Sequence, residues 1–458
     1  MKLEMTTGQP LRRILAFCGP VLAGNLFQQF YNLADSFLVG RIIGLNAFAA
    51  VGSTGALSFL VTGFALGTCS GLAIPIAQSY GAGNYPQLRR RAGQLVWLGL
   101  LISLLLMAVS WLWTDDILRI TQTPAELFDE AYRYILIVFL GAGATVLYNL
   151  LSAVLRAMGD SRTPLVFLMV TVVLNVALDI ILMKYIPLGV EGAAWATVLS
   201  QAVSGLACLV YIAKKVPVLW LSRWDLKPDL RMMGSIAGLG IPMGLQFSIT
   251  AVGSIMLQSA VNGLGTQAVA AVTAGGKVHN VVSAPLDTCG VAMATYCGQN
   301  LGAGRPDRIR KGVGQITAAA MAYCLLALGI VRAFGTSASA IFLEAPSGEL
   351  LAQVEEYLLI STVAYPFLAV IFIFRNALQG MGFSREAMSA GVAELFARAL
   401  AAFGLVGLLG FRAVCLASPL AWVFADVILL LLYRKELGRL SAAAAPAASR
   451  RRSFRVAQ

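Results

Sequence analysis

Apolar runs of about 20 residues follow one another along the whole chain, separated by short polar segments. A helix of about 20 residues crosses the ~30 Å hydrocarbon core of a bilayer, because each residue adds about 1.5 Å. Each run therefore predicts one transmembrane helix. The runs are 14–40, 48–78, 93–113, 133–156, 163–186, 192–213, 234–261, 268–298, 313–334, 355–379, 387–409 and 413–434. This pattern predicts an all-α membrane protein with twelve transmembrane helices.

Two loops of the chain are near copies of each other. GAGNYPQLRRRAGQ occupies residues 81–94, GAGRPDRIRKGVGQ occupies residues 302–315, and each directly follows an apolar run. The same offset of 221 positions superposes Gly44 on Gly265. An internal duplication with a binding site at the repeat interface is typical of secondary transporters. We therefore expect two pseudo-symmetric six-helix bundles.

The runs and the polar segments together predict the domain organisation. The expected parts are a cytoplasmic N-terminus (1–13), a first lobe of helices one to six (14–213), a cytoplasmic linker (214–233), a second lobe of helices seven to twelve (234–434) and a basic cytoplasmic tail (435–458). Low hydrophobicity and high charge predict disorder in the tail from about residue 440.

Composition and charge placement agree with a membrane protein. Apolar residues make up 58% of the chain and charged residues only 12%, against roughly a quarter charged in soluble domains. Most of the 34 Lys and Arg residues, Arg375 among them, fall in the connections on one side of the predicted helices. Six fall on the other side: Arg41, Arg119, Arg133, Lys184, Arg332 and Arg412.

This asymmetry predicts that both termini are cytoplasmic, because basic loops stay on the cytoplasmic side. It also accounts for the net charge of +12 without a nucleic-acid partner. The sequence therefore predicts a multi-pass protein of the plasma membrane, in bacteria the inner membrane, with the lipid bilayer as its main partner.

No motif indicates covalent chemistry. The seven cysteines form no CxxC pair and lie in apolar helices, which is typical of buried thiols. His279 is the one histidine, so a metal site or a His-based triad is not indicated, and there is no GxxxxGK[ST] motif for ATP. We predict neither an enzyme nor a cofactor, and transport must then be driven by an ion gradient.

Polar residues inside the first predicted helix lie on one face. Gln28, Asn32 and Asp35 are spaced i, i+4 and i+7. An ionisable group in a membrane helix is costly and by default marks a pathway or a coupling site. The alternative for the amides is hydrogen bonding between helices.

A second polar face lies on helix five, where Asn175 and Asp179 are spaced i and i+4, and Thr197 follows on helix six. Two carboxylates in one half-bundle would be strongly destabilising unless they bind a cation, and two like charges at short range retain a proton at unusually high pH. This favours a cation site over structural hydrogen bonds.

At these residues the chain resembles the multidrug and toxic compound extrusion (MATE) family of the wider MOP flippase superfamily. The resemblance rests on FQQFYNLADSFLVGR (27–41) with Pro20 before it, LNVALDIILM (174–183), GAAWATVLSQ (192–201) and the paired loops. It implies two lobes arranged in a V, antiport of a drug against H⁺ or Na⁺, and no cofactor. It also implies that Asp35, Asn175, Asp179 and Thr197 bind the coupling ion.

The second half departs from one branch of that family. NorM-like members carry an acid on helix seven eight residues after its proline, and counting from Pro242 gives Thr250 here. The repeat equivalents of Asp35 are Met256 or Leu257, so the second half has no matching acid. This asymmetry favours the DinF-like and MepA-like branch.

Other charged residues lie in the helices of the second half. Lys277, His279 and Asp287 on helix eight are expected to line a wet cavity. Glu394 and Arg398 on helix eleven are spaced i and i+4, which favours a structural ion pair over a role in binding substrate.

Two functions remain open from the sequence. The favoured function is a secondary active antiporter that exports amphipathic, often cationic, small molecules by alternating access, acts as a monomer, and bends its first helix at Pro20 as a hinge. The alternative is a flippase for lipid-linked oligosaccharide precursors. Flippases of this superfamily commonly have more helices and a strongly cationic cavity, whereas only Lys277 and Arg398 lie clearly within predicted helices here.

Overall fold

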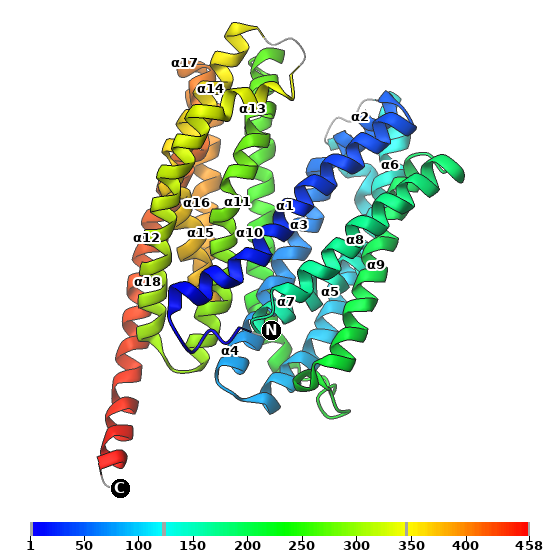
Figure 1. The fold of residues 1–458 in the computed structure, drawn as a ribbon. Helices are drawn as coiled ribbons and strands as arrows, with labels where there is room; N and C mark the ends of the chain where they lie inside the picture. Colours follow the sequence, from blue (N-terminus) through cyan, green and yellow to red (C-terminus); the bar gives the residue numbers. More distant parts are fainter. Residues whose placement is uncertain (1–2, 121–124, 344–346, 457–458) are drawn as a thin grey trace. The chain divides into compact units, whose positions relative to one another are not determined.

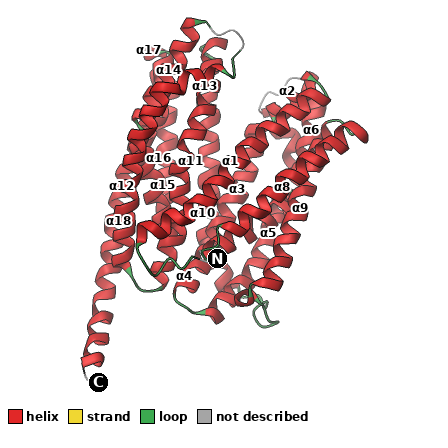
Figure 2. Ribbon diagram, in the orientation of Figure 1, coloured by secondary structure: helices red, strands yellow, loops and turns green. Residues whose placement is uncertain are grey.

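The computed structural model describes residues 3–120, 125–343 and 347–456, and these residues form helices and short connections without a strand (Figures 1 and 2). The side chains of a few residues in α1 to α6, Asn32 among them, and of the residues after 442 are not described. The all-α prediction is confirmed.

The first repeat contains six long helical segments, several of them broken. They are α1 (Pro10–Ile42), α3 with α4 (Gly55–Leu72 and Ile74–Gly81), α5 (Tyr85–Ile120), α6 with α7 (Ala125–Leu140 and Ala142–Ala157), α8 with the π-helical turn η1 (Arg162–Ile180 and Ile181–Tyr185) and α9 (Val190–Lys215). The short α2 (Leu45–Ser53) follows α1, and the 3₁₀ turn η2 (Pro217–Leu219) follows α9.

The second repeat has the same sequence of segments. They are α10 (Leu230–Asn262), α11 (Thr266–Gly302), α12 with η3 and α13 (Pro306–Ile330, Val331–Gly335 and Thr336–Ala340), α14 with α15 (Gly348–Val363 and Tyr365–Gly380), α16 with η4 and α17 (Ser384–Ala399, Leu400–Leu405 and Val406–Leu409) and α18 (Phe411–Val456).

Length and apolar composition alone identify most of these segments as spans. Among the described residues, eight helices qualify, and the bent pairs α6–α7 and α14–α15 raise the number to ten. α1, with 33 residues, and α11, with 37, are the two remaining long helices, and both carry the polar residues discussed below. The described chain thus contains the twelve predicted spans.

The duplication extends to irregularities of the helices. α6 and α7 meet at 46°, and their repeat equivalents α14 and α15 meet at 47°. At the first break, a Cβ added to Gly141 would lie 2.2 Å from the Val198 side chain, so only glycine fits there. At the second break Pro366 occupies the first turn of α15, where its missing N–H costs nothing.

The structure forms two compact units whose limits differ from the predicted lobes at both leading helices. Unit 1 comprises residues 1–3, 19–79 and 84–251, and unit 2 comprises 4–18, 80–83 and 252–458. α1 therefore begins within unit 2 and continues in unit 1, while the first part of α10 belongs to unit 1.

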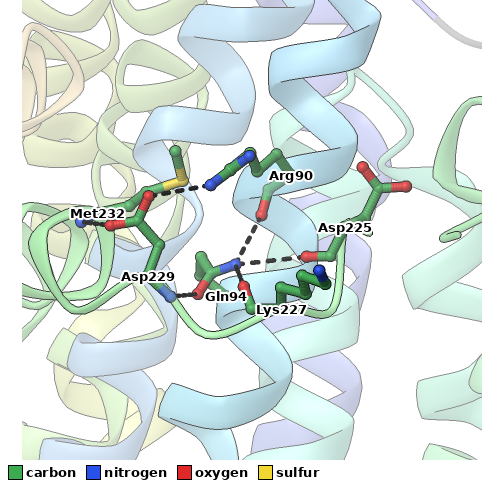
Figure 3. Close-up of polar contacts among 6 residues, drawn as sticks. All are labelled: Arg90, Gln94, Asp225, Lys227, Asp229 and Met232. Carbon is green, nitrogen blue, oxygen red and sulfur yellow. Dashed lines mark hydrogen bonds and ion pairs between the residues drawn. The ribbon is translucent and has the colours of Figure 1, made fainter. Parts of the chain in front are cut away.

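Hydrogen bonds explain why the start of α10 belongs to unit 1. The side chain of Gln94 on α5 donates to the carbonyl oxygens of Asp225 (3.3 Å) and Lys227 (3.0 Å) and accepts from the Asp229 amide (2.9 Å) (Figure 3). The Trp97 indole donates to the Leu226 carbonyl at 2.8 Å. We call these contacts the linker anchor. The predicted linker 214–233 is thus a folded part of unit 1.

Asp229 caps α10 within the linker anchor. Its carboxylate accepts the backbone N–H of Met232 at 3.0 Å and pairs with Arg90 at 3.2 Å (Figure 3). Both contacts favour the ionised form, and the pKa of Asp229 is lowered, first by the Met232 amide and then by Arg90.

The start of α1 is held on unit 2 by the equivalent loop of the second repeat. Gln315, offset by 221 from Gln94, accepts the Leu11 amide at 3.2 Å. Arg308 donates to the carbonyl oxygens of Met5, Thr7 and Gly8 at 3.0–3.3 Å. We call these contacts the N-terminal anchor. Each duplicated loop therefore holds the leading helix of the other repeat.

α18 is helical backbone as far as Val456. The disorder expected of the tail from about residue 440 stays a prediction. One further expectation needs correction. Arg375 was counted among the loop charges, but it lies within α15 and is buried. Apolar residues around Arg375 exclude water from its side chain. An ion pair, and not solvent, balances its charge.

Candidate functional site

The predicted polar residues of unit 1 come from three helices. Asp35 lies on α1, Asn175 and Asp179 lie on α8, and Thr197 lies on α9. α8 packs against α9, and small buried residues such as Ser204 let the two helices approach closely, with the Thr171 hydroxyl 2.6 Å from that of Ser204. This packing places the polar faces of α8 and α9 together.

Direct contacts join the polar residues. The Asn175 side chain donates to the Thr197 hydroxyl at 3.4 Å, and the Tyr31 hydroxyl lies 3.3 Å from the same oxygen. Asp35 follows Tyr31 by four residues on α1 and Asp179 follows Asn175 by four residues on α8, so each carboxyl lies on the helix face that makes these contacts. The structure therefore brings together the four residues that the sequence predicted to act together.

Several oxygens of this cluster receive no hydrogen bond. Among the residues that the structure describes, no donor reaches Oδ1 of Asp35, Oδ1 of Asn175 or either carboxylate oxygen of Asp179. Asn175 and Asp179 are both completely buried. Desolvated carboxylates without donors are strongly destabilising unless a cation balances them. A proton shared between the two carboxyls would give each acid a partner, and Na⁺ would be satisfied by the same set of oxygens.

A small polar cavity adjoins the cluster within unit 1. Its volume is about 80 Å³, and Gln28, Tyr31, Asn149, Ser200 and Gln201 contribute polar groups to its wall. A water needs about 10–15 Å³ of such space, so the cavity has room for several waters. Because Tyr31 lines the cavity and also contacts Thr197, the cluster has a polar connection to this space.

Asn32 is the remaining predicted residue of the α1 face, and its side chain is not among those that the structure describes. Gln28 lines the cavity as expected. Pro20 lies inside α1, one residue after the position where the chain passes from unit 2 to unit 1.

Unit 2 contains no equivalent acid pair at the repeat positions, since Met256 and Leu257 stand there. Instead, Glu394 pairs with Arg375 and lies 3.7 Å from Arg398. Glu394 and Arg398 thus lie within ion-pair distance, and Arg375 is an additional partner of Glu394. All three side chains are at least nine-tenths buried.

Lys277, His279 and Asp287 do not form one group. His279 contacts the Tyr365 hydroxyl through Nδ1 at 3.0 Å and stacks on Trp422 with ring centroids 6.2 Å apart, so it belongs to an aromatic cluster. Asp287 is half-buried further along α11. Lys277 lines a separate pocket near the start of α11.

Sequence reasoning missed three residues. Tyr31 is four residues before Asp35 and so shares its helix face, a signal that was available. Arg375 and Asp426 each interrupt an apolar run, and Asp426 is buried on α18 with its Oδ1 reached by no donor among the described residues. An ionisable residue inside an apolar run was again the available signal.

Comparison with known proteins agrees with this geometry. The MatE family model matches residues 20–181 and 242–403, one match in each repeat. These two matches cover most of the chain, and the chain therefore belongs to the MatE family of membrane transporters. The resemblance found in the motifs is confirmed.

Relatives and solved structures extend the comparison. The chain is 28% identical over 380 residues to the probable multidrug resistance protein YpnP of Bacillus subtilis strain 168, covering 83% of this chain and 84% of that protein. It is 32% identical over 307 residues to the probable multidrug resistance protein YoeA of the same organism, covering 66% of each. An outward-facing structure of a multidrug resistance MATE family transporter of the MOP superfamily matches the fold with a TM-score of 0.88 at 21% identity, covering 96% of this chain and 99% of that one.

Proposed function

We propose that this protein is a secondary antiporter that exports amphipathic small molecules in exchange for H⁺ or Na⁺. Family membership supports transport across a membrane, and the names of its relatives support multidrug export. The coupling ion would bind at Asp35, Asn175, Asp179 and Thr197, with Tyr31 as a further hydroxyl beside Thr197.

The observation that carries this proposal is the set of four buried oxygens without donors in unit 1. Two neutralised acids are stable there, and two ionised acids are not. Binding a cation would therefore lower the free energy of the conformation in which the two carboxyl groups are buried away from water. Releasing the cation would favour a conformation in which the carboxylates contact water. Such a difference in affinity between two states is what an ion needs to drive a conformational cycle.

The energy of one coupling ion is sufficient for export. A single charge moving inward gains about 2.3 kcal/mol per 100 mV, and this corresponds to a roughly fiftyfold gradient of a neutral substrate. The same oxygens suit H⁺ and Na⁺, so the choice of ion is left to experiment.

The proposal is tested by substrate counterflow in proteoliposomes with pH and Na⁺ gradients imposed separately. Asp35→Asn should abolish gradient-driven efflux while the protein remains folded and binds substrate, and Asp179→Asn should do nearly the same. The double variant should be little worse than either single variant, because the two acids act as one unit. Asp115→Asn, which removes an exposed acid paired with Arg119, is the control and should behave as wild type.

Two results would contradict the coupling site. One is full gradient-driven efflux in Asp35→Asn. The other is a double variant whose loss equals the product of the two single losses, since this would show that the acids act independently.

The flippase alternative is less well supported. Of the charged side chains in the second half, Arg375, Glu394 and Arg398 are tied up in ion pairs. Dye efflux from energised vesicles separates the two functions, because a lipid flippase should not move a soluble dye. The proposed setting is the plasma membrane, in bacteria the inner membrane, with both termini cytoplasmic.

A further inference from the structure

A second cavity lies within unit 2, far along the chain from the acid pair. Its volume is about 430 Å³, and it is formed by the end of α10, the first three turns of α11 and residues that follow α13. Its polar side chains are Asn262, Thr266, Thr273 and Lys277. We call it the Lys277 pocket.

One face of α11 builds the polar side of this pocket. Thr266, Thr273 and Lys277 are spaced by seven and four residues, so two hydroxyls and an ammonium project from the same side of the helix. Lys277 lies eleven residues after the start of α11, about 16 Å along the axis. Its charge is therefore set well inside a membrane-spanning helix.

The Lys277 ammonium has an aromatic neighbour and no acidic one. It lies 5.3 Å from the centre of the Phe342 ring. No carboxylate of the described residues comes within 4.0 Å of it, although ten other ion pairs meet this criterion. A cation–π contact offsets only part of the cost of holding an ammonium at this depth.

The pocket is complementary to an organic anion. An acidic group placed at Lys277 would receive a charge-assisted hydrogen bond, with hydroxyl donors from Thr266 and Thr273 on the same wall. The apolar remainder of such a molecule would contact Phe342, Val269 and Ala270. A cationic molecule would meet repulsion from Lys277 instead.

We propose that the Lys277 pocket binds the acidic group of amphipathic organic anions, and that such anions are substrates alongside the cations expected from the sequence. The ligand chemistry is a carboxylate or a phosphate next to an aromatic or apolar body. This inference rests on the proposed export function and adds a substrate class to it. It also separates the two charges in the protein, since the coupling cation binds in unit 1 and the substrate anion in unit 2.

The experiment compares two dyes that share a xanthene ring system, anionic fluorescein and cationic rhodamine 6G. Lys277→Met keeps the length of the side chain and removes its charge. It should weaken fluorescein binding and slow fluorescein efflux by at least about tenfold, as expected from the loss of a charge-assisted hydrogen bond. Rhodamine efflux should be unchanged or faster. Lys277→Arg should retain fluorescein efflux, and Lys184→Met, which removes an exposed lysine of unit 1, is the matched control.

Fluorescence anisotropy of fluorescein with the purified protein in micelles tests the pocket without transport. If wild type binds fluorescein through Lys277 but neither dye is exported, the export proposal fails and the pocket stands. If both dyes are exported and Lys277→Met changes the efflux of both dyes equally, the pocket proposal fails and the export proposal stands.

A lipid phosphate is the competing source of the same chemistry. Adding phosphatidylglycerol to the micelles should leave fluorescein binding within about twofold of its value in micelles without phospholipid. Displacement of fluorescein by phosphatidylglycerol, with efflux of fluorescein lost in liposomes that contain this lipid, would assign the pocket to a headgroup and overturn the inference.

Discussion

Gly93 shows how one residue fixes the approach of two segments. A Cβ built at this position of α5 would lie 2.0 Å from the carbonyl oxygen of Asp225 in the linker. The backbone of residue 225 cannot move away easily, because its carbonyl is also bound by Gln94. Glycine is therefore required where the linker crosses α5.

Gly93→Ala should destabilise the protein by about 1–3 kcal/mol, the usual cost of an added methyl group in a packed site. Thermal unfolding of the purified variant measures the effect. Gly314 is the repeat equivalent of Gly93, and a Cβ there meets nothing within 4 Å, so Gly314→Ala is a matched control that should be neutral. Equal stability of the two variants would show that the close approach is relaxed in solution.

Asp229 gives a prediction for pH dependence. Its pKa is lowered in the folded protein by the Met232 amide and by Arg90, so its contribution to stability is fully present above the unfolded pKa of about 3.9 and is lost as the pH falls through the folded value. Asp229→Asn should therefore lower the unfolding temperature at pH 7. The difference between wild type and variant should shrink as the pH falls below about 4, and a difference independent of pH would contradict the assignment.

The acid pair shows what the sequence could and could not predict at this scale. Asp35, Asn175 and Asp179 were identifiable because a carboxylate or an amide in an apolar helix is rare, and helical spacing placed them on faces. Spacing within one helix does not define which faces of different helices meet. For that reason the partners of Tyr31 and Arg375, which lie on other helices, were found only in the structure, although both residues carried a signal in the sequence.

At the scale of helices, α1, like α10, belongs to both units. Its first turns are fixed on unit 2 by the N-terminal anchor, and its remainder from Gly19 belongs to unit 1. Pro20 removes one backbone hydrogen-bond donor immediately after this division. The helix therefore bends most easily where it passes from one unit to the other.

Pro20→Ala should restore the missing backbone hydrogen bond and stiffen α1 at this position. We expect a lower rate of substrate turnover with little change in substrate affinity, since no contact of the acid pair is altered. Turnover in proteoliposomes and equilibrium dye binding measure the two quantities. Equal losses in turnover and affinity would argue against a hinge at Pro20.

Helix positions were more predictable than helix ends or unit limits. A bilayer imposes a length on apolar runs, and each of the twelve runs falls on one of the long segments of the structure. Hydropathy carries no information about hydrogen bonds between distant segments. The assignment of residues 4–18 to unit 2 depends on Arg308 and Gln315, which lie about 300 positions away, so it was outside the reach of sequence patterns.

For the whole molecule, the two duplicated loops make the orientation testable. Each turns at a glycine in the left-handed region, Gly83 and Gly304, both with φ of +67°, and each is followed by basic residues. Equivalent backbone geometry and equivalent charge predict that both loops lie on the same side of the membrane, the cytoplasmic side.

Single cysteines should show this orientation. Asn84→Cys and Asp307→Cys should react with a membrane-impermeant maleimide only from the cytoplasmic side. Tyr185→Cys, in the turn η1 that follows α8, should react only from outside. Both loop positions are exposed, whereas six of the seven native cysteines are buried, so background labelling should be low. Labelling of either loop from outside would overturn the topology.

The N-terminal anchor also has a consequence for how the protein is made. Ribosomes add about 5–20 residues per second, so Arg308 and Gln315 emerge roughly 15–60 s after residues 5–11, which include their hydrogen-bond partners. The linker anchor has a shorter delay of roughly 7–27 s, because Gln94 precedes its partners by 131–135 residues. During synthesis the beginning of α1 is thus left without its hydrogen-bond partners while unit 1 is already able to fold. Residues 5–11 therefore leave the ribosome well before the residues that hold them in place.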